Sequence, residues 1–112
     1  MITDVAAYMA ELGQRARAAS RALAAAETRL PALAGAKFTC EDLADLRLCL
    51  AGEGRYEIFF GRDEMLLSGL AVGAGGAIGS TYNFAAPLYA RLIRAFRQGN
   101  LEEARQCQSR SV

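Results

Sequence analysis

The sequence predicts an α/β fold in which three parallel strands alternate with helices, behind a long leading helix. Three observations support this prediction. Residues 3–29 repeat apolar side chains every three or four positions, as an amphipathic helix does. Later in the chain, short apolar runs are bounded by glycine and proline, and these runs alternate with helical patterns. Strands and helices that alternate in this way pair in parallel through right-handed crossovers.

The leading helix is expected to cover most of residues 1–29. This segment is rich in alanine, contains no proline and gathers its apolar residues on one stripe. Thr3 or Asp4 can cap it, because either side chain accepts a hydrogen bond from the first free amides of a helix. The stripe consists mostly of small residues, which favours close packing inside the fold. We therefore divide the chain into residues 1–29 and a strand-containing segment, residues 30–112.

Each later element is assigned from an apolar run and from the turn residues that bound it. The expected strands cover residues 33–39, 56–60 and 76–80. The expected helices cover residues 41–50, 63–72, 87–97 and 101–108. The first strand, residues 33–39, is predicted to be buried because most of its residues are apolar. Asp63 and Asn100 stand where they can cap the second and the last of these helices.

Composition excludes several classes of function. The 112 residues suffice for one domain of modest size, and the net charge of +1 gives no reason to expect a nucleic-acid partner. Charged residues interrupt every apolar stretch before the ~20 residues that span a bilayer, so no membrane partner is expected. Histidine is absent, which excludes Ser-His and Cys-His nucleophile pairs and leaves a zinc site short of its usual ligands. No metal site is expected.

Cysteine usage favours a cytoplasmic location. The three cysteines, Cys40, Cys49 and Cys107, are odd in number, widely spaced and outside any Cys-x-x-Cys motif. Such a set is typical of reduced thiols. The first residues of the chain also lack the basic start and apolar core of a signal peptide.

Lys37 is the candidate nucleophile. It is the only lysine of the chain, and the other twelve basic residues are arginine. An amine attacks a ketone only when it is uncharged, and apolar surroundings disfavour the charged form of a lysine. Leu33 and Phe38 belong to the apolar run around it, whereas arginine could not act in its place because a guanidinium stays charged. The alternative is a lone lysine in an arginine-rich sequence.

Four further candidates follow the ends of the expected strands: Gly61, Asp63, Glu64 and Ser80. The carboxyl ends of parallel strands share one edge of a sheet, so these residues and Lys37 are expected to converge there. Each also has a structural alternative. Asp63 can cap a helix, Glu64 can offset the dipole at a helix start, and Ser80 can belong to a tight turn.

Three runs carry a resemblance to a known family: GAKFT at residues 35–39, FGRDE at 60–64 and GAGGAIGSTYN at 73–83. In order and spacing they resemble the pyruvate-dependent class I aldolases of the N-acetylneuraminate lyase and dihydrodipicolinate synthase family. The resemblance covers residues 30 to about 111. It implies a partial (β/α)8 TIM barrel that keeps strands six to eight and the start of the C-terminal helices.

The resemblance also implies chemistry. Lys37 corresponds to the lysine that forms a Schiff base with pyruvate, and the protonated imine then acts as an electron sink without any cofactor. The other four positions correspond to residues that bind the hydroxylated tail of a sugar acid such as N-acetylneuraminate: Gly61, Asp63, Glu64 and Ser80. The family's loop for the pyruvate carboxylate and its proton-relaying tyrosine have no match here. Turnover by this chain alone is therefore not expected.

Residues 1–29 resemble a different protein, the start of glutamate-5-semialdehyde dehydrogenase, also called gamma-glutamyl phosphate reductase. This resemblance brings no catalytic residue, and it suggests a chimeric reading frame. Two alternatives to a lyase-derived site therefore stay open, a non-catalytic remnant or interaction module and a dehydrogenase-related piece. Because exposed edges of a sheet invite pairing, we expect a homo-oligomer or association through these edges.

Overall fold

The computed structural model describes residues 6–7, 10, 22–23, 25–26, 28–51 and 56–112. The leading helix expected over residues 1–29, with its cap at Thr3 or Asp4, therefore lies largely outside the described residues. The described positions between residues 6 and 29 are helical. The part that holds the predicted site is described almost throughout.

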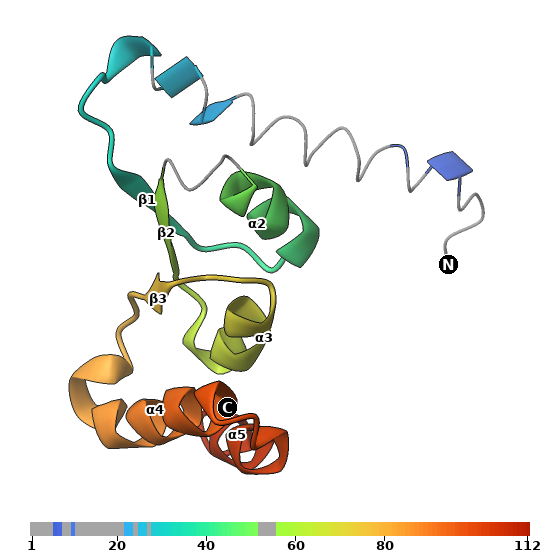
Figure 1. Cartoon of the computed structure of the whole chain (residues 1–112), viewed down its shortest axis with the longest axis vertical. Coiled ribbons are helices and arrows are strands. Elements are labelled where there is room, and N and C mark those ends of the chain that lie inside the picture. Colours follow the sequence, from blue (N-terminus) through green and yellow to red (C-terminus); the bar gives the residue numbers. More distant parts are fainter. Residues whose placement is uncertain (1–5, 8–9, 11–21, 24, 27, 52–55) are drawn as a thin grey trace.

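Three short strands form one parallel sheet in the order β1-β2-β3 (Figure 1). They are β1 (Gly35–Phe38), β2 (Glu57–Phe60) and β3 (Gly76–Ala77). Lys37 of β1 lies opposite Phe59 of β2. The predicted α/β fold with three parallel strands is confirmed. Each strand is shorter than expected, β1 at both ends, β2 at its start and β3 at its end.

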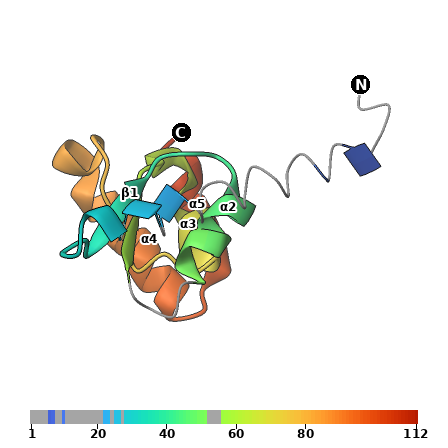
Figure 2. The same cartoon turned by 90° about the horizontal axis from the view of Figure 1, so that it is seen from above.

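The helices are α2 (Leu43–Leu50), α3 (Leu66–Ala71), α4 (Tyr82–Arg97) and α5 (Leu101–Ser109), with a 3-10 turn, η1 (Asp63–Met65), before α3. Helices α2 and α3 lie on the same side of the strands in both views (Figures 1 and 2). Helix α4 packs along α5 below α3 (Figure 1). Within the described part of the chain, no helix is long and apolar enough to cross a membrane.

The two faces of the sheet differ in their cover. Ile58 and Phe60 point to the face that carries α2 and α3, and both are buried there in a cluster with Leu46 and other apolar residues. Successive strand residues point to opposite faces. The other face carries Lys37 and Glu57, which are exposed. The prediction of a buried first strand is therefore wrong at Lys37, because none of the described elements covers this face.

The start of α3 differs from the sequence prediction. A helix capped by Asp63 was expected from residue 63, but the chain first forms η1, and α3 begins only at Leu66. Asp63 caps neither, because its carboxylate accepts hydrogen bonds from Thr81 instead. Met65 precedes α3 and gives it no side-chain cap. The carboxylate of Asp63 thus binds Thr81, which is distant in the sequence, and not the nearby helix amides that it was expected to cap.

Helix α4 starts earlier than the prediction, at Tyr82 and not at Pro87. The backbone leaves the helical region at Ala85 (φ −117°, ψ 21°), two residues before the proline. Proline has no amide hydrogen to donate and its ring crowds the preceding turn, so a kink is expected there. The turn before the kink carries the residues that adjoin the site.

The predicted cap of the last helix is confirmed. The side chain of Asn100 accepts a hydrogen bond from the amide of Glu103 at 3.2 Å and donates one to its carboxylate at 3.1 Å. Gly99 precedes it with a positive φ of 75°, a conformation that glycine adopts without strain.

Replacing Asn100 by alanine should lower the free energy of unfolding by about 1 kcal/mol, because an amide at the start of α5 loses its partner. Urea unfolding of both proteins measures the difference. Asn100→Ser is the control, since serine also accepts the capping bond. Equal losses in the two variants would contradict a capping role.

Candidate active site

The segments that follow the three strands lie side by side. The amide of Gly61 donates to the carbonyl of Phe38 at 2.8 Å, and the amide of Ile78 donates to the carbonyl of Phe60 at 3.0 Å. These bonds extend the ladders past the last strand residues. The carboxyl ends of the strands thus form one edge, with the five predicted residues on or directly after it: Lys37, Gly61, Asp63, Glu64 and Ser80.

Lys37 and Gly61 are direct neighbours. A Cβ atom at position 61 would lie 2.7 Å from the Cε atom of Lys37 and would collide with the hydroxyl of Thr39. A larger residue at position 61 would therefore push the lysine stem and the Thr39 side chain from the places they take beside the end of β2. The structure explains why a glycine stands at the position where the sequence predicted a site residue.

Lys37 borders an open hollow of about 310 Å³ on the uncovered side of β1. Glu57 and Phe59 of β2 line it together with residues 34–36. The ring of Phe59 packs over Gly76, where a Cβ atom would come within 2.9 Å of it. The amine thus projects from an exposed sheet face that offers one apolar ring and one carboxylate. A small ketone can reach it.

Asp63 is buried, with 5% of its surface exposed. Its Oδ2 atom accepts hydrogen bonds from the amide of Thr81 at 2.9 Å and from the hydroxyl of Thr81 at 2.5 Å. Its Oδ1 atom lies against Gly79, where any added Cβ would overlap the carboxylate. Asp63 therefore ties the loop after β2 to the loop after β3, and Gly79 makes the close approach possible.

Two tyrosines of α4 lie next to Asp63 and its partner Thr81. The hydroxyls of Tyr89 and Thr81 share a hydrogen bond of 2.7 Å. The rings of Tyr82 and Tyr89 meet edge to face, with centroids 4.4 Å apart and planes at 81°. Burial raises the pKa of Tyr82 above its ordinary value, and the negative charge of Asp63 raises it further. Tyr82 therefore stays a neutral phenol beside a carboxylate.

Glu64 and Ser80 are the exposed members of the predicted set after β2 and β3. Glu64 lies within η1, and the carbonyl of Ser80 accepts hydrogen bonds from Asn83. Their side chains can reach a ligand at this edge, whereas the carboxylate of Asp63 is held inside. The predicted residues are therefore adjacent but not equivalent.

A further ion pair joins the loops after β1 and β2. Arg62 pairs with Glu41 through its Nη2 atom. The two side chains are 39% and 68% exposed, and pairs at such exposed sites contribute little to stability. The pair places opposite charges at the rim next to Glu64.

Three residues that support this edge were not predicted from the sequence: Thr81, Tyr89 and Gln108. Thr81 binds the carboxylate of Asp63, Tyr89 shares a hydrogen bond with the hydroxyl of Thr81, and Gln108 reaches the same loop from α5. One signal could have drawn attention to them. Tyr89 and Gln108 are polar residues on the apolar faces of their helices, next to Leu92 and Cys107 respectively. A polar side chain at such a position requires a partner.

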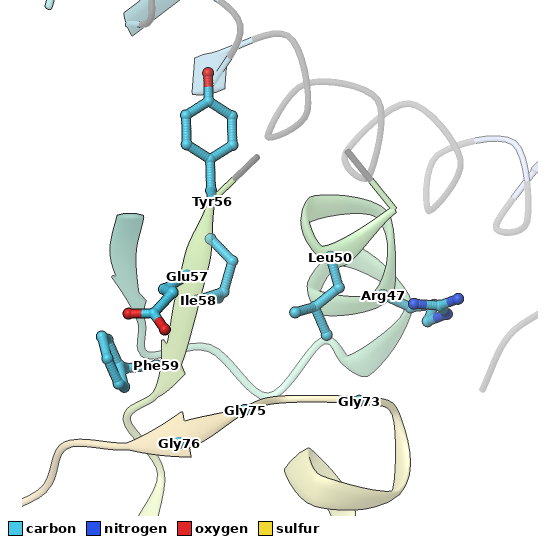
Figure 3. Close-up of a pocket in the computed structure, with 9 residues that line it drawn as sticks. All are labelled: Arg47, Leu50, Tyr56, Glu57, Ile58, Phe59, Gly73, Gly75 and Gly76. Atoms are coloured by element: carbon cyan, nitrogen blue, oxygen red, sulfur yellow. The ribbon is translucent and has the colours of Figure 1, made fainter. Parts of the chain in front are cut away.

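A second hollow, of about 300 Å³, lies at the opposite end of the strands (Figure 3). It is bordered by the start of β2, the end of α2 and glycines before β3. Arg47 extends away from the strands, while Glu57 lies on the other face of β2 beside Phe59 (Figure 3). The charged groups that line this second hollow do not converge on one point. The edge formed by the carboxyl ends of the strands is therefore the better candidate for an active site.

Comparison with known proteins assigns the chain to a family. Residues 22–112 match the dihydrodipicolinate synthetase family. The chain belongs to this family. The match begins before residue 30, where the sequence analysis placed the start of the resemblance, and it includes every predicted site residue. The suggested likeness of residues 1–29 to a dehydrogenase stays a prediction.

Members of the dihydrodipicolinate synthetase family that are similar to the chain include several N-acetylneuraminate lyases. It is 42% identical to that of Xenopus tropicalis over 83 residues, which are 74% of this chain and 27% of the relative. It is 39% identical to that of Rhizobium meliloti over 79 residues, 70% of this chain and 26% of the relative. The chain thus spans about a quarter of the curated relatives that it matches.

A solved structure shows the same arrangement. The N-acetylneuraminate lyase of Proteus mirabilis superposes with a TM-score of 0.76 and 46% sequence identity, over 80% of this chain and 30% of that chain. The three parallel strands and their helices therefore correspond to part of the barrel of such a lyase. The predicted partial barrel is confirmed.

Proposed function

We propose that this chain carries the Schiff-base residue and the sugar-acid side of a pyruvate-dependent aldolase site, whose substrate is a sugar acid such as N-acetylneuraminate. The observation that carries the proposal is the lone lysine at the carboxyl edge, with its stem fitted beside Gly61. The likeness to N-acetylneuraminate lyases supports the substrate class.

The proposed chemistry begins at Lys37. The uncharged form of its Nζ atom attacks the keto carbon of pyruvate or of the sugar acid. The carbonyl oxygen leaves as water, and a protonated imine remains. When a base takes the proton of the sugar acid's reacting hydroxyl, that oxygen becomes an aldehyde carbonyl, the adjacent carbon–carbon bond breaks, its electron pair flows into the imine, and the aldehyde leaves. The resulting enamine takes up a proton, and water hydrolyses the imine to release pyruvate and the free amine.

The loops after β2 and β3 would hold the hydroxylated tail of the sugar acid. Glu64 offers carboxylate acceptors, and Ser80 offers a hydroxyl that both donates and accepts. Both are exposed at the edge that also carries Lys37. Asp63 contributes indirectly, because its carboxylate fixes Thr81, the residue after Ser80.

Adduct formation, and not turnover, is the activity expected of these 112 residues. Cleavage also requires a clamp for the pyruvate carboxylate and a group that moves the proton of the sugar hydroxyl, and the sequence offers no match for the family's elements. Positioning and proton transfer each contribute orders of magnitude to a rate. An imine requires only the amine and the ketone.

Borohydride trapping tests the proposal. The folded chain is incubated with pyruvate and reduced, and the product is examined by intact mass and peptide mapping. We expect one pyruvate adduct on the peptide that contains Lys37. The map separates it from reaction at the N-terminal amine, the only other amine of the chain. A folded sample without an adduct at Lys37 would reject the proposal and favour a non-catalytic module.

A further inference from the structure

Gln108 of α5 reaches across to the loop that carries Asp63 and Glu64. Its Oε1 atom accepts a hydrogen bond from the amide of Leu67 at 2.7 Å. Its Nε2 atom donates to the backbone carbonyl of Asp63 at 3.1 Å. The two contacts lie on either side of Glu64 in the chain. One side chain thus holds the backbone both before and after that residue.

One of these contacts satisfies an amide that the loop itself leaves unpaired, and the other adds a second hydrogen bond to the carbonyl of Asp63, which also accepts one from the amide of Leu66. The first amides of a helix have no partner within the helix, and α3 begins without a side-chain cap. Gln108 supplies the missing acceptor to Leu67 from another helix. The carbonyl that it binds belongs to the peptide bond between Asp63 and Glu64, so the orientation of Glu64 depends on it.

The amide of Gln108 is itself fixed in place. Its Nε2 atom also donates to the hydroxyl of Ser111 at 2.6 Å, and that hydroxyl donates to the carbonyl of Gln108 at 2.7 Å. Both amide hydrogens and the amide oxygen of Gln108 are therefore engaged. Cys107, the residue before it, is buried against α3 and α4. The side chain is held in one orientation before any ligand arrives.

We propose that Gln108 is a positioning residue for the sugar-acid side of the site, which rests on the function proposed above. It touches no substrate. By holding the first residue of η1 and the first turn of α3, it presents the carboxylate of Glu64 to the hydroxylated tail of the ligand. Lys37 lies on β1, whereas the described side-chain hydrogen bonds of Gln108 go to Asp63, Leu67 and Ser111, so pyruvate chemistry at the lysine is expected to be independent of it.

The test compares two isosteric substitutions on the same helix. In Gln108→Glu, a carboxylate oxygen replaces the amide nitrogen that faces the carbonyl of Asp63, so the bond is lost and two oxygens repel. Gln106→Glu makes the same chemical change at an exposed position whose side-chain amide donates to Glu102 on the same helix. Gln108→Met is the second variant, because it removes the hydrogen bonds without adding charge.

Three quantities are measured on each protein: the Kd for N-acetylneuraminate by NMR titration, the rate of pyruvate trapping at Lys37, and the exchange rate of the Leu67 amide. Both Gln108 variants should bind the sugar acid about tenfold more weakly, because a fixed carboxylate becomes mobile. Their Leu67 amide should exchange faster. Pyruvate trapping should stay within about twofold of the wild type, and Gln106→Glu should match the wild type throughout.

The outcomes separate this inference from the proposed function. Wild-type affinity in both Gln108 variants would overturn the inference alone, as would a parallel loss of sugar-acid binding and pyruvate trapping, which indicates general unfolding. A wild-type chain that traps pyruvate but binds no sugar acid would reject the proposed substrate class, and the positioning role with it. Selective loss of sugar-acid affinity supports the proposal.

Discussion

Replacing Lys37 by arginine is expected to abolish the pyruvate adduct on its peptide completely. Arginine keeps its positive charge at any ordinary pH and is a poor nucleophile, so no imine forms at that position. No second lysine can take over, since the chain has none. Intact mass after borohydride reduction should show at most the background that reaction at the N-terminal amine produces.

The fold should tolerate this substitution, which makes the result interpretable. Lys37 is exposed, and the guanidinium of an arginine can extend into the same open hollow. A change of less than about 0.5 kcal/mol in the free energy of unfolding is expected, as for most surface substitutions. A variant that unfolds like the wild type and still carries its adduct would assign the chemistry to another amine.

Local signals in the sequence identified those parts of the fold that short-range interactions decide. Asn100 was predicted as a cap because its partner, Glu103, lies three residues away. The three strands followed from apolar runs and turn residues. In each case the group and its partner, or the run and its boundaries, fall within one short stretch of chain.

Interactions across the fold account for the errors. Asp63 was predicted to cap a helix, but Thr81, 18 residues later, binds its carboxylate. Gln108 was not predicted as a site residue because its partners, Leu67 and Asp63, lie 41 and 45 residues away in the sequence. The exposure of Lys37 depends on which elements cover a face of the sheet, and an apolar run does not specify that. The residue types at the site were thus predictable, while their burial was not.

Phe60→Ala should lower the free energy of unfolding by about 3–5 kcal/mol, the range for removing a fully buried aromatic ring. The side chain is 0% exposed and belongs to the cluster with Leu46 and Ile58. Small domains are stable by only about 5–15 kcal/mol, so this loss threatens the folded state itself. Urea unfolding at low temperature measures it, and Phe84→Ala, which truncates a ring that is 79% exposed, should change little.

A second substitution shows whether the cost comes from the contact between β2 and α3. A Cβ atom at Gly69 of α3 would collide with the ring of Phe60, so Gly69→Ala should also destabilise the wild type. In the Phe60→Ala background the added methyl group meets a cavity, and Gly69→Ala should then cost less. Additive losses would show that the ring acts elsewhere. Coupled losses would tie α3, and with it the loop of Asp63 and Glu64, to the core through this one contact.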